Sequence, residues 1–111
     1  SIEVISGHPV FDKTDNGTVF VQREAIRWPL TIRSVEAGDR FQPFGMDGHT
    51  RKLQDFLVDL KLEPFEKKKV LVLTNPDHIL WVMGYRLDER CRVDEKAQEM
   101  YRVVYSTRTM D

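Results

Sequence analysis

The chain has a single cysteine, no long hydrophobic run and no excess of either charge. Because Cys91 is alone, an internal disulfide is excluded, and the composition fits a reducing cytosol. No apolar segment approaches the roughly 20 residues that a transmembrane helix needs, and no signal peptide is visible. We therefore expect a cytoplasmic protein that has no membrane partner.

Motifs for nucleotide binding, metal binding and nucleophilic catalysis are also absent. There is no G-x-x-x-x-G-K-[ST] loop, no G-x-G-x-x-G between a strand and a helix, and no G-x-S-x-G. The three histidines, His8, His49 and His78, are scattered and lack metal-ligand spacing. We expect no catalytic residue, no metal and no cofactor in this chain.

The charge balance gives little support to nucleic-acid binding by the surface as a whole. The chain has 17 basic and 18 acidic residues and a net charge of -1. Residues 31–69 contain eight basic and seven acidic side chains. A bulk positive field is therefore absent, and any anion site must come from local geometry.

The length of 111 residues suits one compact domain spanning residues 1–111. Hydrophobic residues make up 41% of the chain and charged residues 32%, as in folded domains. The first residue is Ser1 rather than methionine, so we expect the chain to be a piece of a longer protein.

The apolar pattern predicts strands at both ends of the chain and a helical pair in the middle. Asp15-Asn16-Gly17 is a strong turn signal between the first two strands. A helix is expected from Thr50, as its N-cap, to Leu60, and a short second helix from Pro64 to Lys69. Strands are expected around residues 2–4, 18–21, 30–35, 70–74, 79–83, 85–87 and 100–106. The fold class is therefore α+β, with mainly antiparallel sheets and one inserted helical pair.

The segment 38–59, GDRFQPFGMDGHTRKLQDFLVD, carries the clearest functional signal. A stiff loop leads into the predicted helix, whose first turn holds Arg51 and Lys52, and such a helix start can bind phosphate. Gly45 and Gly48 form a G-x-x-G like that of the KH-domain RNA clamp. Alternatively, these glycines only permit a positive φ in a tight turn.

Three arginines lie next to predicted strands or turns, and arginine suits bidentate phosphate contacts. They are Arg33, Arg40 and Arg86. The alternative is a structural ion pair, for example Arg40 with Asp39 or Arg86 with Asp88.

For other candidate RNA-binding residues, the sequence favours a structural role over contact with RNA. Arg51 can pair with Asp55 across one turn of the helix. The lysines that begin at Lys67 suit a solvated helix end. Trp81 and Tyr85 could stack on bases, but the apolar surroundings of Trp81 favour a core position.

Taken together, four segments resemble the C-terminal domain of tRNA(Ile)-lysidine synthase in order and spacing. They are Pro29-Leu30-Thr31-Ile32-Arg33, the run Gly38-Asp39-Arg40-Phe41-x-Pro43-Phe44-Gly45-Met46, the run Lys52-Leu53-x-Asp55-Phe56-Leu57-x-Asp59, and Ile79-Leu80-Trp81-Val82-x-Gly84-Tyr85-Arg86-Leu87-Asp88. The resemblance spans most of residues 28–93 and implies a β-sandwich-like domain with helices, shared with a domain of the phenylalanyl-tRNA synthetase β subunit.

The resemblance also implies an activity for the longer protein. Enzymes of this family use ATP to join lysine to the first anticodon cytidine of tRNA(Ile). ATP, and with it magnesium, belongs to a catalytic domain that holds a pyrophosphate loop, and no such loop is present here. The implied partners of this chain are tRNA(Ile), at its acceptor end, and the catalytic domain of the same polypeptide.

Six basic residues form the expected RNA-binding face, and they are Arg33, Arg40, Arg51, Lys52, Lys67 and Arg86. Lys67 and Leu71 stand where relatives often have arginine and then proline, so a bidentate contact at Lys67 is weakened. The alternative function is a protein-interaction or interdomain packing module without RNA contact.

Overall fold

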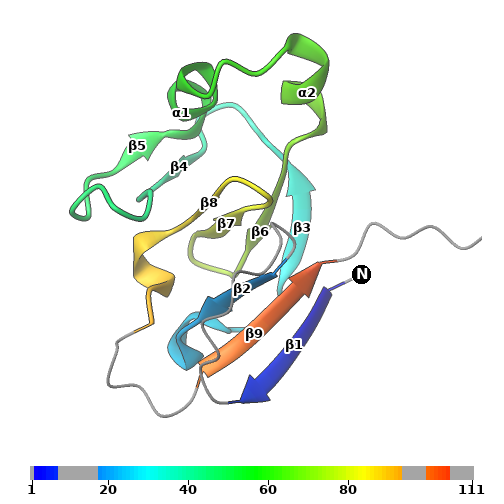
Figure 1. Ribbon diagram of the computed structural model, residues 1–111, viewed down its shortest axis with the longest axis vertical. Helices are drawn as coiled ribbons and strands as arrows, with labels where there is room; N and C mark the ends of the chain where they lie inside the picture. The colour runs from blue at the N-terminus through cyan, green and yellow to red at the C-terminus, as the bar shows by residue number, and fades with distance from the viewer. Residues whose placement is uncertain (1, 8–17, 94–99, 106–111) are drawn as a thin grey trace, which may run out of the picture.

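Two antiparallel sheets, a short ribbon and a helical pair make up the fold (Figure 1). The computed structural model describes residues 2–7, 18–93 and 100–105, and side chains of 18–93 and 100–104. The first sheet has the order β1–β9–β2. Its strands are β1 (Ile2–Gly7), β2 (Thr18–Val21) and β9 (Met100–Tyr105). The predicted turn Asp15-Asn16-Gly17, and the end of the last predicted strand at Ser106, lie outside the described residues.

The second sheet is the central layer and has the order β3–β6–β7–β8. Its strands are β3 (Thr31–Ser34), β6 (Leu71–Thr74), β7 (Ile79–Val82) and β8 (Arg86–Leu87). The apolar run and the turn after Thr74 predicted the β6–β7 hairpin, which is confirmed. A register shift at Leu73/Thr74 leaves Leu80 between the paired residues of β7.

The helical pair lies between the ribbon and β6 along the chain. The helices are α1 (Leu53–Asp59) and α2 (Pro64–Lys69), and two short 3-10 turns occur at η1 (Arg23–Ala25) and η2 (Glu89–Cys91). The prediction of α2 is confirmed. Pro64 stands at its start, and Glu63 and Glu66 form a reciprocal capping box.

The helix predicted from Thr50 begins at Leu53 instead. Arg51 and Lys52 form strand β5, with Lys52 opposite Arg40 of β4. The Leu53 N–H donates at 2.9 Å to a backbone carbonyl in the turn before β4, so the ribbon holds the chain extended up to this point. The prediction that Thr50 caps the helix, and that Arg51 and Lys52 lie in its first turn, is therefore wrong.

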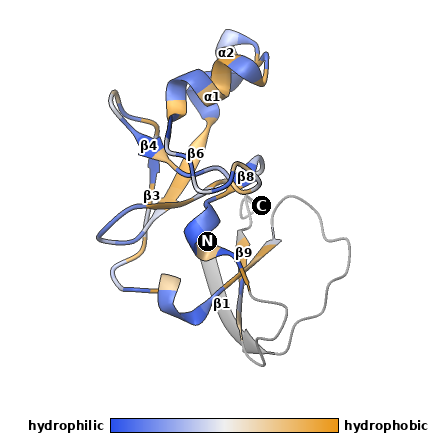
Figure 2. Cartoon of the chain, turned by 90° about the vertical axis from the view of Figure 1, so that its left-hand side faces the viewer, coloured by the Kyte–Doolittle hydropathy of each residue, from blue (hydrophilic) through white to orange (hydrophobic). Residues whose placement is uncertain are grey.

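Two hydrophobic clusters pack against opposite faces of the central sheet. Leu73 and Trp81, which pair across β6 and β7, pack in the cluster that includes Val21 and Val103 of the first sheet. The other cluster lies beneath α1 and includes Phe41, Leu53, Phe56, Leu57, Val70, Val72, Ile79 and Val82. Figure 2 shows this as orange along β6 and as alternating orange and blue on α1. Successive side chains of β6 therefore pack into different clusters, one on each face of the sheet. The predicted core position of Trp81 is confirmed.

Cys91 lies in the first of these clusters and is fully buried. Burial raises the pKa of its thiol to about 12, with a further contribution from the charge of Asp88. The thiol is therefore neutral at physiological pH and acts as a small apolar side chain.

Candidate nucleic-acid interface

The six basic residues predicted as an RNA-binding face differ in how their charges are compensated. Arg33, on β3, is held by Asp39 through two hydrogen bonds of 2.9 and 3.0 Å. Its Nη1 also donates to the carbonyl of Ser34. The hydrogen bond to Asp39 raises the pKa of Arg33. Burial alone would raise the pKa of Asp39, but bonds from Arg33 and from the Glu36 backbone lower it. Arg33 therefore forms a structural ion pair with Asp39.

Arg51 also has an internal partner. Its Nη2 contacts the carboxylate of Asp59 and lies 3.4 Å from the carbonyl of Asp55. The predicted pairing with the carboxylate of Asp55 is therefore replaced by a pairing with the next turn of α1. Arg51 ties the ribbon to the helix.

The ribbon β4 (Arg40–Phe41) and β5 places Arg40 directly opposite Lys52. Both side chains are exposed, and neither has a carboxylate partner among the described residues. Like charges in directly opposed positions destabilise an antiparallel pair. Their neighbours Phe41 and Arg51 also face each other, and Phe41 is completely buried. The buried Phe41 therefore fixes the outward position of two uncompensated cations.

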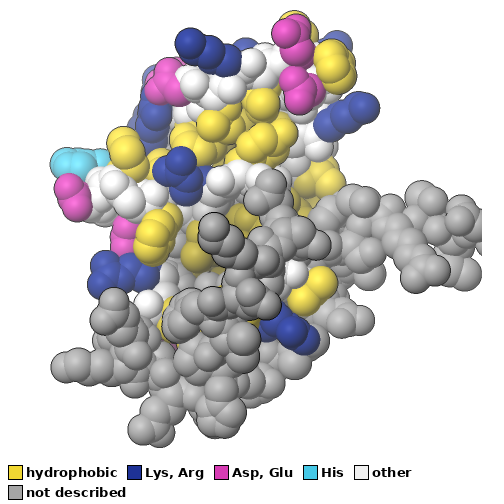
Figure 3. Space-filling model, in the orientation of Figure 1, with side chains coloured by type: hydrophobic (Ala, Val, Ile, Leu, Met, Phe, Trp, Pro, Cys, Tyr) yellow, Lys and Arg dark blue, Asp and Glu magenta, His cyan; other side chains and the backbone are white. Residues whose placement is uncertain are grey.

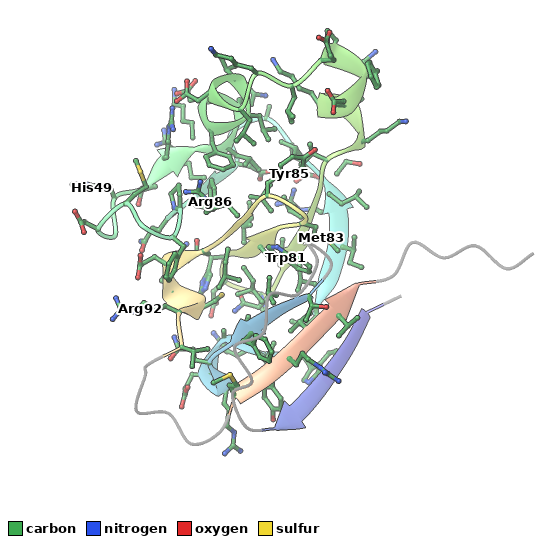
Figure 4. All side chains as sticks on the ribbon, in the orientation of Figure 1. His49, Trp81, Met83, Tyr85, Arg86 and Arg92 are labelled. Atoms are coloured by element: carbon green, nitrogen blue, oxygen red, sulfur yellow. The ribbon has the colours of Figure 1, made fainter. Side chains whose placement is uncertain are left out.

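Arg86 is fixed without an acidic partner. Its Nη1 donates to the carbonyl of Phe44 at 3.1 Å, and its guanidinium carbon lies 5.4 Å from the centre of the Phe56 ring. The suggested pair of Arg86 with Asp88 is not formed. Figure 4 shows Arg86 beside Tyr85, below α1. Arg86 is thus a third cation whose charge the described carboxylates do not neutralise.

Lys67 lies apart from this group, in the last turn of α2 with two further lysines. It has no ion pair among the described residues, and its positive charge suits the carboxyl end of a helix. The structure therefore brings Arg40 and Lys52 together and leaves Lys67 on another element.

An open groove of about 420 Å³ lies beside Arg40. Its lining is mainly polar, and comes from the turn before β4 and the turn between β6 and β7. The lining includes Arg33, Asp39, Arg40, Thr50, Asn75, Asp77, His78 and Arg90. Asp39 and Asp77 each pair with an arginine, Arg33 and Arg27 respectively. Arg40 is therefore the uncompensated cation among the arginines that line the groove.

His78 contributes a neutral ring to this groove. Burial lowers its pKa, as does the charge of Arg90, while Asp88 acts in the opposite direction. The Nε2 atom of His78 is buried and has no hydrogen-bond partner among the described residues. His78 therefore lines the groove, but its Nε2 atom is closed off from solvent.

The sequence did not single out the pair formed by Asp88 and Arg90. Asp88 is completely buried and accepts hydrogen bonds from the backbone of Gln42 and from the backbone and guanidinium of Arg90. The hydrogen bond to Asp88 raises the pKa of Arg90. Asp88 thus joins the loop after β4 to the segment after β8. This role was missed in the sequence because Asp88 was not considered as a buried acid.

The loop between β4 and β5 needs its glycines. Gly45 and Gly48 have φ angles of 92° and 78°, which confirms the predicted positive φ at both. Strand β5, and not a helix, follows Gly48, so the KH-like arrangement is not formed. The glycines shape the turn that precedes Arg51.

Gly45→Ala should lower the free energy of unfolding by about 1 kcal/mol, because alanine is strained at positive φ. A Cβ at this position would meet nothing within 4 Å, so the cost comes from the backbone alone. Gly45→Asn should cost less, since asparagine tolerates this conformation. Thermal unfolding would check both variants, and identical melting temperatures for Gly45→Ala and the wild type would contradict the prediction.

No helix among the described residues is long and apolar enough to cross a membrane. Within the same residues, no group of His, Cys, Asp and Glu side chains is arranged to hold a metal ion.

Comparisons with known proteins agree with this fold. Residues 30–105 match the family model described as the TilS substrate C-terminal domain. A crystal structure of the TILS C-terminal domain superimposes with a TM-score of 0.75 at 23% identity, and the match covers 93% of this chain and 80% of that one. That likeness confirms the α+β fold.

Curated relatives match part of their own length. The tRNA(Ile)-lysidine synthase of Parabacteroides distasonis is 38% identical over 73% of this chain, and that of Bacteroides thetaiotaomicron 39% over 68%. The enzyme of Caldanaerobacter subterraneus is 33% identical over 78%. The chain spans 18% of the length of each of these relatives. With a family-model match over most of its length, the chain belongs to the C-terminal domain family of the tRNA(Ile)-lysidine synthases.

Proposed function

We propose that this domain binds the acceptor end of tRNA(Ile) for a cytoplasmic ligase that joins lysine to the first anticodon cytidine. The observation that carries the proposal is the Arg40–Lys52 pair of the ribbon. Two like charges face each other across the ribbon without a described carboxylate beside them. A phosphate placed between them would relieve their repulsion.

The local geometry supports a phosphate as the ligand. Arg40 borders a polar groove whose acidic residues are already paired, so an incoming anion meets little competing negative charge. Arginine and lysine contacts to phosphate position a nucleic acid and carry little base information. The ribbon would therefore hold the tRNA without reading its sequence.

The chemistry of the proposed ligase belongs to another part of the polypeptide. ATP and magnesium would bind in a catalytic domain, which would be the second partner of this chain. The start of α1, which the sequence suggested as a phosphate site, does not supply one. The helix has only seven residues, and the N–H of Leu53 is already bonded to the Asp39 carbonyl. This chain is therefore proposed to supply substrate binding alone.

The alternative is an interdomain packing module. It draws support from Arg33 and Arg51, whose guanidinium groups form internal ion pairs. In that case the cations of the ribbon would stay solvated and would add nothing to RNA affinity.

Arg40→Gln in the full-length protein should weaken binding of tRNA(Ile) by roughly threefold to tenfold, because one exposed polar contact contributes about 0.5–1.5 kcal/mol net. The slope of log K against log[salt] should fall by about one unit or less, because one phosphate contact is lost. Filter binding or fluorescence anisotropy at several salt concentrations would measure both quantities. A folded Arg40→Gln protein with wild-type affinity and slope would favour the packing module.

A further inference from the structure

Arg86 lies in a position that an internal structural role does not fully explain. One hydrogen bond, to the carbonyl of Phe44, and the ring of Phe56 hold its guanidinium. Phe56 is itself held by Phe41, at a ring distance of 5.1 Å and an angle of 83°. The described residues leave Nε and Nη2 of Arg86 without hydrogen-bond partners. The guanidinium of Arg86 is therefore held in place and still has N–H groups that can donate hydrogen bonds to a ligand.

No described carboxylate forms a salt bridge with this cation. Glu89 contacts the neighbouring loop, where it accepts a hydrogen bond from the N–H of Gly45. It pairs with Arg92 at 3.5 Å and not with Arg86. The charge of Arg86 is therefore open to an external anion.

Two residues with exposed aromatic rings neighbour Arg86, one through its backbone carbonyl and one in sequence. Phe44 is 44% exposed, and its backbone is bonded to Arg86 and to Leu87. Tyr85, which precedes Arg86 in the turn after β7, is 41% exposed. Figure 3 shows hydrophobic and basic side chains side by side on this face of the molecule, and Figure 4 labels Tyr85 and Arg86 there. We call Phe44, Tyr85 and Arg86 the aromatic platform.

We propose that the aromatic platform binds unpaired nucleotides of the single-stranded 3′ end of the tRNA, with Arg86 on a phosphate and the rings of Phe44 and Tyr85 against bases. This inference rests on the proposed function and adds the part of the substrate that is recognised. Rings stack only on bases that are not already stacked in a helix, so the platform suits single-stranded RNA and not a duplex.

The platform continues the proposed phosphate-binding surface along the chain. Phe44 follows β4, so residues 40–52 carry Arg40 and Lys52 at their two ends and Phe44 between them. The segment is anchored at both places, by the ribbon and by the Phe44–Leu87 backbone bond of 2.9 Å. The cations of the ribbon and the ring of Phe44 therefore belong to one anchored segment of the chain.

The test compares two forms of tRNA(Ile), one with a complete 3′ end and one trimmed to a blunt acceptor stem, in binding to the full-length protein. The wild type should bind the complete tRNA about tenfold more tightly, because stacking contributes roughly 1–3 kcal/mol per base. The variant Phe44→Ala/Tyr85→Ala should bind both forms with the affinity that the wild type has for trimmed tRNA. Arg86→Gln, which keeps both rings, should lose part of the preference. Phe65→Ala, which removes an exposed ring from α2, should keep the full preference.

The outcomes separate this inference from the proposed function. Equal, salt-dependent binding of both tRNAs by the wild type would overturn the platform and leave the ribbon contacts standing. Binding that does not respond to salt or to Arg40→Gln would overturn the proposed function itself. If the double variant weakens both tRNAs equally, or loosens contact with the rest of the polypeptide, the platform is a protein contact and the inference fails. Circular dichroism of Phe44→Ala/Tyr85→Ala would establish that it is folded.

Discussion

Asp88→Ala should lower the free energy of unfolding by about 3 kcal/mol, which is a large part of the 5–15 kcal/mol that stabilises a typical domain. Asp88 is completely buried, and its carboxylate accepts hydrogen bonds from Gln42 and Arg90. Without this carboxylate, the charge of Arg90 has no ion-pair partner among the described residues. The estimate lies at the low end of the range for broken buried pairs, because the Arg90 side chain is 38% exposed and can turn to water.

Urea unfolding followed by tryptophan fluorescence would measure this loss. Asp88→Asn keeps the shape and one acceptor oxygen but removes the charge, so its effect should be intermediate. Asp55→Ala removes an exposed carboxylate from α1 and should change stability by less than about 0.5 kcal/mol. A change below about 1 kcal/mol in Asp88→Ala would mean that the buried pair does not hold the two segments together.

Arg40→Gln/Lys52→Gln should have opposite effects on binding and on stability. Loss of both cationic contacts should weaken tRNA binding roughly 10- to 100-fold at low salt and lower the salt slope by at most about two units. The free energy of unfolding should stay the same or rise by a few tenths of a kcal/mol, because the two charges repel each other across the ribbon. Weaker tRNA binding together with an equal or higher free energy of unfolding is the result expected for residues that contribute to binding and not to stability.

Lys68→Gln/Lys69→Gln is the charge-matched control, since it removes two cations from the last turn of α2. It should change affinity only through the overall charge, and therefore much less than the ribbon variant. If both double variants weaken binding equally, the ribbon has no special role. If the ribbon variant loses stability instead, Arg40 and Lys52 belong to the structure of the domain.

The parts of the fold that depend on local sequence were predicted well. The β-branched run before Asn75 and the return at Ile79 predict a hairpin, and Pro64 predicts the start of a short helix. Each of these signals involves residues close in sequence. The start of α1 was wrong because β5 is two residues long and exists through its pairing with β4. This tertiary pairing overrides the helical tendency of Arg51 and Lys52, and the helix begins only at Leu53.

The partners of the charged residues were harder to predict for a related reason. Asp39 and Arg40 are adjacent, but Asp39 lies in the turn before β4, where its carboxylate meets Arg33 of β3 instead. Asp88 caps the η2 turn, which aims its carboxylate at Arg90. Sequence neighbours suggested ion pairs that the local backbone direction does not allow, so the uncompensated cations could be identified only from the structure.

The position of β9 between β1 and β2 has a consequence for synthesis on the ribosome. Val103 lies opposite Val4 on one side and Val19 on the other, so both early strands find their partner in the last described strand. Until β9 has left the exit tunnel, β1 and β2 have no partner in their sheet, and their edges can pair with other chains. Pairing over such sequence distances is also slow. We therefore expect the three-stranded sheet to form only after translation has passed residue 105. Protection of the nascent chain by chaperones is most useful before that point, while the edges of β1 and β2 are unpaired.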